Sequence, residues 1–176
     1  MVDGKTLTRA QAREAILALL DEARQLVPSE RPAELPGAVN GEGAYIPGWH
    51  SFEHVVWRYG SDIWGLLTEH PALRDDDDLC EQIIAIVTNP AALRGRQSFI
   101  LACGSVKFAA YAPQIASQLG DPDVEGQALS TLIKMRAGAY AAQVRPLLDS
   151  PSGFIRKFAK RYLARYEGAS DGVGLS

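Results

Sequence analysis

The chain has 176 residues, of which 47% are apolar and 22% charged, and its net charge is −3. This length predicts one domain with a sizeable core, and the composition argues against an intrinsically disordered chain. An acidic net charge is unfavourable for a general DNA-binding protein, and the absence of long apolar runs predicts no bilayer-spanning helix.

The first predicted helix begins after Thr8, which forms a capping-box pattern with Gln11, and it extends to Val27 with one apolar face. Further helices are expected over about 51–69, from the Asp75–Asp78 run to Asn89, and over 92–104, 108–119, 123–135, 138–148 and 153–166. The tail 168–176 contains Gly and Ser and is expected to be flexible.

Residues 28–48 separate the first two helices and contain four prolines and four glycines. No helix is expected at this density of breakers, and no period-two alternation predicts a strand anywhere in the chain. We therefore expect one domain made of an N-terminal helix (1–27), a Pro/Gly-rich loop (28–48), helical repeats (49–167) and the tail. A loop of this length is expected to be either functional or a linker.

The second half of the chain is similar to itself. The stretch Tyr111-Ala112-Pro113-Gln114-Ile115 matches Tyr140-Ala141-Ala142-Gln143-Val144, and Val124, Ala128 and Leu132 match Ile155, Ala159 and Leu163. This pattern predicts a helical hairpin that is repeated and stacks into a solenoid. The alternative is an irregular helical bundle in which the similarity is coincidental. Both Asp121-Pro122-Asp123 and Asp149-Ser150-Pro151 are expected to supply caps at helix starts.

These residues resemble the HEAT-like repeat of phycobilisome lyases. Asp121-Pro122-Asp123-Val124 begins one such repeat, and Ile155-Arg156-Lys157 keeps the basic residue that follows the aliphatic one. Val124-Glu125-Gly126 departs from that pattern. The resemblance implies an all-α fold, an α-α superhelix or solenoid of HEAT-like hairpins with about eight helices. It implies little about function.

No catalytic motif is present, and we expect no catalytic residue, no metal and no cofactor. His50 and His54 have the spacing of a two-ligand metal site, but Glu53 is misplaced for the HExxH pattern, so a histidine pair at a helix start is the simpler interpretation. Cys80 and Cys103 lie in apolar stretches and are interpreted as buried side chains rather than a disulfide or metal ligands.

Three groups of side chains are candidate partner-binding surfaces. His54, Trp57 and Trp64 form a second stripe on the predicted helix 51–69, which is either buried by the loop and first helix or exposed as an aromatic interface. The run Asp75, Asp76, Asp77 and Asp78 is either a solvated helix start or an electrostatic patch. The last helix offers an alternative basic surface, or a polar cap of the repeats, with Arg156, Lys157, Lys160 and Arg161.

The charges divide between the two halves of the chain. Residues 1–88 carry 7 Lys and Arg against 15 Asp and Glu, whereas residues 89–176 carry 11 against 6. The resulting balances of −8 and +5 predict opposite potentials at the two ends of a solenoid. Such an arrangement would orient a partner and speed its encounter.

The chain is of compact size and ends in a basic predicted helix, Arg156-Lys157-Phe158-Ala159-Lys160-Arg161-Tyr162-Leu163. In both respects it resembles HEAT-like immunity proteins of bacterial polymorphic toxin systems. This resemblance implies a non-catalytic protein-binding module whose partner is another protein, such as a cognate toxin; nucleic acid and membrane partners are not expected. A cytoplasmic location is expected because no apolar stretch directly follows residues 1–8, as it would in a signal peptide. One alternative is a HEAT-like scaffold or adaptor. The other is an enzyme similar to the HEAT-like alkylpurine DNA glycosylases, which use a basic concave groove; this chain is short and has the opposite net charge.

Overall fold

The structure, a computed structural model, describes residues 7–41, 43 and 45–167. Most of this part of the chain is helical. The α-helices are Arg9–Leu26 (α1), Ser51–Glu69 (α2), Asp77–Val87 (α3), Gln97–Ala102 (α4), Ala112–Ala116 (α5), Glu125–Met135 (α6), Ala141–Val144 (α7) and Gly153–Tyr166 (α8). Four 3-10 segments lie between them, at Pro71–Asp75, Pro90–Arg96, Val106–Tyr111 and Arg145–Asp149.

The long amphipathic helices form as the sequence predicts. Before α1, the Thr8 amide donates to the Gln11 side chain at 2.9 Å and the Gln11 amide donates to the Thr8 hydroxyl at 3.3 Å, so the predicted capping box is confirmed. Helix α2 has the predicted bounds. The helices predicted over 92–104, 108–119 and 138–148 are each divided into a 3-10 segment and a short α-helix.

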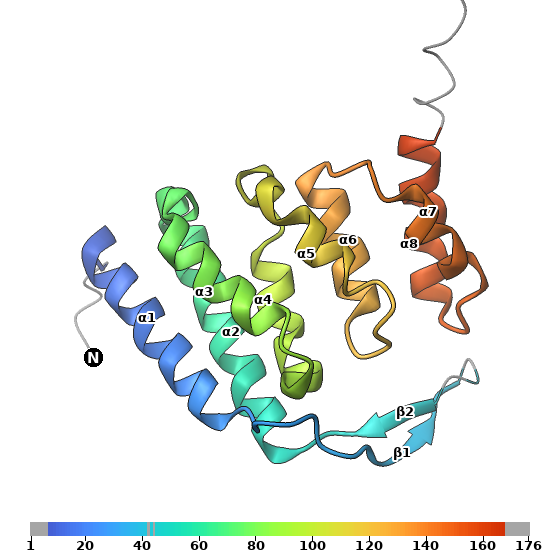
Figure 1. The fold of residues 1–176 in the computed structure, drawn as a ribbon, viewed down its shortest axis with the longest axis horizontal. Helices are drawn as coiled ribbons and strands as arrows, with labels where there is room; N and C mark the ends of the chain where they lie inside the picture. Colours follow the sequence, from blue (N-terminus) through green and yellow to red (C-terminus); the bar gives the residue numbers. More distant parts are fainter. Residues whose placement is uncertain (1–6, 42, 44, 168–176) are drawn as a thin grey trace, which may run out of the picture.

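The helices lie in a row, with α1, α3 and α5 packed in succession on one side and α2, α4, α6 and α8 on the other (Figure 1). The core lies between these two sets. At the crossing of α2 and α4 the backbones approach closely, because a Cβ atom on Gly60 would lie 2.2 Å from Ser98 Oγ and 2.5 Å from the Phe99 ring. Gly60 is therefore required by the packing of α2 on α4.

The expectation of no sheet was wrong, because residues 28–48 contain an antiparallel hairpin of Leu35–Val39 (β1) and Tyr45–Gly48 (β2). The strands are too short for an alternating pattern to be visible, and each contains a proline. Such a short, two-stranded ribbon has only edge strands, where proline is tolerated. Gly37 permits the close pairing, since a Cβ atom there would lie 1.8 Å from the Ile46 carbonyl oxygen.

The predicted caps of α6 and α8 were also wrong. Val124 is the N-cap of α6 and gives it no side-chain hydrogen bond, while the hydroxyl of Ser152 caps α8 by accepting from the Ile155 amide at 3.5 Å. Asp121 instead accepts from the Asp123 amide at 3.0 Å and forms a turn ahead of α6. Because neither Asp121 nor Asp123 caps α6 with its side chain, both carboxylates can contact arginine side chains.

No helix in the described part of the chain combines the length and apolar character needed to cross a membrane. The predicted tail, 168–176, lies outside the described residues.

The hairpin extends along one edge of the helix row, from the start of α2 toward α8 (Figure 1).

Candidate functional site

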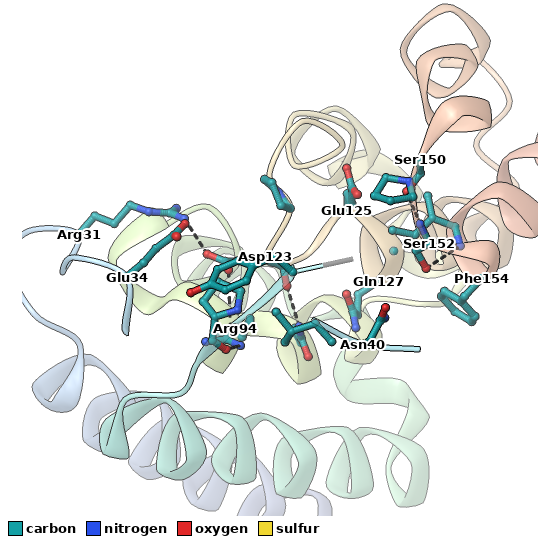
Figure 2. Close-up of a pocket in the computed structure, with 18 residues that line it drawn as sticks. Arg31, Glu34, Asn40, Arg94, Asp123, Glu125, Gln127, Ser150, Ser152 and Phe154 are labelled. Atoms are coloured by element: carbon teal, nitrogen blue, oxygen red, sulfur yellow. Dashed lines mark hydrogen bonds and ion pairs between the residues drawn. The ribbon is translucent and has the colours of Figure 1, made fainter. Parts of the chain in front are cut away.

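A cleft of about 540 Å³ lies between the hairpin and the starts of α6 and α8 (Figure 2). It is lined by Arg31, Glu34, Asn40, Tyr45, Ile46, Pro47, Arg94, Gln97, Pro122, Asp123, Glu125, Gly126, Gln127, Ser150, Pro151, Ser152, Phe154 and Ile155. Arg31 and Glu34 lie at one end of the view, and Ser152 and Phe154 at the other. Segments far apart in the sequence thus meet at one concave site.

Arg94 holds the second strand of the hairpin against the helices. Its guanidinium donates to the carbonyl oxygens of Pro47 and Gly48 at 2.6 and 2.5 Å. It also lies over the ring of Trp49, with Cζ 4.9 Å from the ring centroid. Because these contacts fix the end of β2, the hairpin wall of the cleft has a defined position.

Arg31 holds the segment before the hairpin. One of its nitrogens donates to Asp121 at 3.1 Å. The other donates to Asp123 at 2.7 Å, as Figure 2 shows. Burial disfavours this cation, but the two carboxylates outweigh burial and raise its pKa. The hairpin is therefore tied to the helices at both of its ends.

The buried carboxylate of Glu53 connects α2 with the segment before α4. It accepts from the His50 amide at 2.6 Å and from the Arg94 amide at 3.0 Å, and it lies 3.4 Å from Arg94 Nε. The Arg94 amide points at Glu53 because Leu93 adopts a positive φ of 48°. This conformation is strained for a non-glycine residue, and the surrounding contacts maintain it.

Arg96 is the largest fully buried side chain among the described residues, with 1% of its surface exposed. It donates to Gln118 at 2.5 Å and to the carbonyl oxygen of Val87 at 3.0 Å, and it pairs with Asp121. Burial lowers the pKa of Arg96 despite the neighbouring carboxylates. Its donors are nonetheless matched by acceptors, as a buried cation requires.

The two aspartates ahead of α6 differ in their environments. Burial acts to raise the pKa of Asp121, but the Asp123 amide and the charges of Arg96 and Arg31 outweigh it, so that pKa is lowered. Burial and the adjacent Asp121 raise the pKa of Asp123, against the opposing effect of Arg31 and Arg94. The arginines therefore stabilise the ionised form of Asp121 more than that of Asp123.

Glu125, in the first turn of α6, is half-buried and has no ion-pair partner among the described residues. Burial, followed by repulsion from Asp121, raises its pKa. The free amides at the start of α6 favour the anion, but they do not offset these two effects. Glu125 is thus a cleft carboxylate whose charge the protein itself leaves uncompensated.

Exposed apolar side chains line the same cleft as this carboxylate. Tyr45 and Ile46 on β2 are 55% and 47% exposed, and Phe154 on α8 is 53% exposed. The Tyr45 hydroxyl accepts from the Gly37 amide at 2.9 Å, which fixes the ring against β1. The cleft therefore combines a polar interior with an apolar rim on two opposing elements.

The predicted aromatic residues lie elsewhere, on the exposed side of α2. His54 is exposed and stacks on Trp49 with ring centroids 4.8 Å apart, and Trp57 and Trp64 are 40% and 37% exposed. Lys134 of α6 lies over the Trp64 ring at 5.5 Å. The three predicted residues share one face of α2, but none of them lines the cleft.

The acidic run is largely engaged within the chain. Asp76 caps α3 by accepting from the Leu79 amide at 3.1 Å. The other contacts of the run are Arg13 with Asp76 at 2.7 Å and with Asp78 at 3.0 Å, and Lys107 with Asp75. Asp77 is exposed, with no ion pair among the described residues. The run is therefore mainly a helix start braced by cations.

The other candidate residues also have local roles. Arg156 donates to the carbonyl oxygens of Ser150 and Pro151 at 2.7 and 2.8 Å, while Lys157, Lys160 and Arg161 are exposed on α8. His50 is the N-cap residue of α2, and its Nε2 lies 3.0 Å from the Ala33 carbonyl oxygen.

No cluster of three potential metal ligands occurs in the described residues. Cys80 and Cys103 are both buried and free, and burial raises the pKa of the Cys80 thiol to about 11.

The sequence reasoning missed the cleft residues, above all Arg31, Arg94, Asp123 and Glu125. Two signals were present: the closely spaced cations Arg94 and Arg96 within a breaker-rich segment, and the paired aspartates ahead of α6. Neither signal indicates that the two segments meet.

Comparisons of the chain with known protein families, with curated proteins and with solved structures return no match.

Proposed function

We propose that the chain is a non-catalytic protein-binding module and that a partner docks at the cleft. One observation carries this proposal: the cleft is rimmed by exposed apolar side chains, whereas its arginines are already paired within the chain. Concave sites with apolar walls and a few polar groups are typical of binding sites, and exposed aromatic side chains are favoured interface anchors.

We further propose that the helices form a HEAT-like solenoid. Tyr111 and Tyr140, the first residues of the repeated stretch, each precede the first residue of a short helix, α5 and α7. The matching Ile115 and Val144 are both fully buried. Equivalent positions with equivalent local structure support a repeat over an irregular bundle.

The proposed partner is a toxin domain, so that the chain would act as a bacterial immunity protein in the cytoplasm. The sequence resemblance supports this role, and the uncompensated Glu125 favours a partner with a basic surface, such as an enzyme that acts on nucleic acid. A scaffold or adaptor with another partner is the second form of the proposal. The aromatic residues Trp57 and Trp64 on α2 are a proposed additional contact.

The test uses the full chain and the separately purified product of the neighbouring gene, analysed by size-exclusion chromatography and calorimetry. We expect a stable complex that Phe154→Asp disrupts. Val106→Asp is the matched control, because Val106 is equally exposed, at 53%, but does not line the cleft. A co-expression assay then asks whether the wild-type chain, but not Phe154→Asp, restores growth in the presence of the toxin.

Two results would contradict the proposal: no complex with the wild-type chain, or a complex that Phe154→Asp and Val106→Asp affect equally. Fluorescence anisotropy with duplex and single-stranded oligonucleotides tests the nucleic-acid alternative. Tight oligonucleotide binding that depends on the cleft residues would favour that alternative instead.

A further inference from the structure

We infer that the cleft receives an arginine side chain, flanked by apolar residues, from an exposed segment of the partner protein. This inference rests on the proposed protein-binding function and specifies the chemistry that the cleft recognises.

The charges beside the cleft form a nearly closed set of pairs. Three guanidinium groups face three carboxylates, and these are Arg31, Arg94 and Arg96 with Glu53, Asp121 and Asp123. Arg156, just outside the lining, is held by two backbone carbonyls. The remaining charged residues that line the cleft are Glu34 and Glu125, which are both negative. The lining therefore has an excess of negative charge that a cationic ligand would neutralise.

Glu125 is the better placed of the two acids. It is half-buried at the start of α6, whereas Glu34 is exposed on the segment before β1. Its raised pKa shows that its surroundings disfavour the anion, and a cation beside it would reverse this effect. An anionic ligand is disfavoured, because Asp121, Asp123 and Glu125 lie at the same helix start.

The apolar rim favours arginine over lysine. The exposed ring of Phe154 and the side chains of Tyr45 and Ile46 offer apolar surface in the same cleft as the acid. A guanidinium is planar and weakly hydrated, so it stacks on aromatic faces more readily than an ammonium group does. The described residues contain three such contacts, of Arg58 with Tyr59, Arg94 with Trp49 and Arg165 with Tyr166.

The size of the cleft favours a chain segment over a single small cation. Its volume of about 540 Å³ is in the range of sites that hold ligands of several functional groups. The rim also extends beyond the acid, from β2 on one side to α8 on the other (Figure 2). A peptide with apolar residues next to its arginine would cover both sides, whereas a free cation would leave them exposed.

The test selects short random peptides displayed on phage against the immobilised full chain. We expect the selected peptides to contain arginine next to aromatic or aliphatic residues. The best peptide is then labelled and measured by fluorescence anisotropy, alongside a version in which citrulline, a neutral isostere, replaces arginine. We expect citrulline or Glu125→Gln to weaken binding about tenfold, since each removes one partly buried charge-assisted contact.

The matched control is Glu81→Gln, which removes an exposed carboxylate on α3 and should leave the affinity unchanged. The inference is overturned if no peptide is enriched, if the enriched peptides lack a cation, or if citrulline and Glu125→Gln leave binding unchanged.

A protein complex that Phe154→Asp disrupts but Glu125→Gln does not would remove this inference and leave the proposed function intact. Peptide binding that depends on Glu125, without any protein complex, would support recognition of arginine by the cleft and contradict the proposed function.

Discussion

Arg31 donates a hydrogen bond to Asp123 at 2.7 Å although the two residues are 92 positions apart in the sequence. The same guanidinium reaches Asp121 at 3.1 Å. Together these contacts attach the segment before the hairpin to the turn before α6. They set the width of the cleft, since its opposite walls belong to the two segments that Arg31 joins.

Replacing Arg31 with Gln should therefore loosen the hairpin more than the fold as a whole. We expect faster amide hydrogen exchange over 35–48, with a loss of global stability on the order of 1 kcal/mol because the pair is partly exposed to solvent. Arg24→Gln, which removes exposed contacts with Asp21 on α1 and Gln82 on α3, is the control. Unchanged exchange in the hairpin of Arg31→Gln would show that other contacts hold it.

Two glycines of α2 should respond to alanine in opposite directions. Gly60→Ala forces a methyl group into Ser98 and Phe99 and should destabilise the protein by about 2–3 kcal/mol. Gly65→Ala meets no atom within 4 Å and should stabilise it by about 0.5–1 kcal/mol through helix propensity. Urea unfolding of both variants measures the difference, and equal effects would contradict the close packing of α2 on α4.

Glu125→Gln should stabilise the free protein, on the order of 0.5 kcal/mol after solvent screening of this half-buried group is considered. The native state raises the pKa of Glu125 above its ordinary value of 4.5, so ionisation of this side chain opposes folding. The gain should therefore be largest at neutral pH and disappear below about pH 4.5, where the carboxyl group is protonated in both states. Thermal unfolding across this pH range is the measurement, and a variant less stable than wild type at neutral pH would contradict the prediction.

Asp76 and Asp77 are adjacent, but only Asp76 should matter for stability. Asp76→Ala removes the cap of α3 and the contact with Arg13 and should cost about 1–2 kcal/mol, whereas Asp77→Ala should change stability by less than about 0.5 kcal/mol. The hydrogen bond from Arg13 lowers the pKa of Asp76 from 3.8, so this contribution is complete above that pH. It is lost as the pH falls through the lower native pKa. Chemical unfolding at neutral and at acidic pH tests both parts.

Replacement of Trp64 on α2 tests binding to the partner separately from stability. Trp64→Ala removes a side chain that is 37% exposed and lies under Lys134, so the variant should fold. If α2 contacts the partner, dissociation should be faster, with a loss on the order of 2 kcal/mol. Surface plasmon resonance measures this rate, with thermal unfolding as the check on folding. A folded variant with an unchanged dissociation rate would restrict the interface to the cleft.

The sequence predicts the long helices well because their patterns are local. α1 and α2 have uninterrupted apolar faces, and a capping box precedes α1, so both could be placed within one residue. The hairpin could not be placed in this way, because its strands are short and contain Pro36 and Pro47. Asn40-Gly41 is a typical turn sequence, but without alternating strands on either side it does not predict a hairpin.

The cleft was harder to predict because it depends on contacts between distant segments. In the sequence Arg94 and Arg96 look like ordinary solvated residues, yet Arg96 is almost completely buried. Its burial follows from the acceptors that Asp121 and Gln118 place around it. No local pattern encodes this arrangement. The candidate residues that the sequence did suggest were conspicuous by type, such as tryptophan and runs of aspartate, rather than by position.

The attachment of the hairpin also affects how the molecule unfolds. In a row of helices that pack mainly on their neighbours, the outer helices can open without disturbing the far end. Arg31 connects distant parts of this row, because it lies between α1 and α2 in the sequence but contacts the turn before α6. Opening of α1 and the segment after it, or of α6, must then strain or break the ion pairs of Arg31 with Asp121 and Asp123. We therefore expect a more cooperative unfolding transition than contacts between neighbouring helices alone would produce. A change that loosens the cleft should then also lower the cooperativity with which the whole chain unfolds.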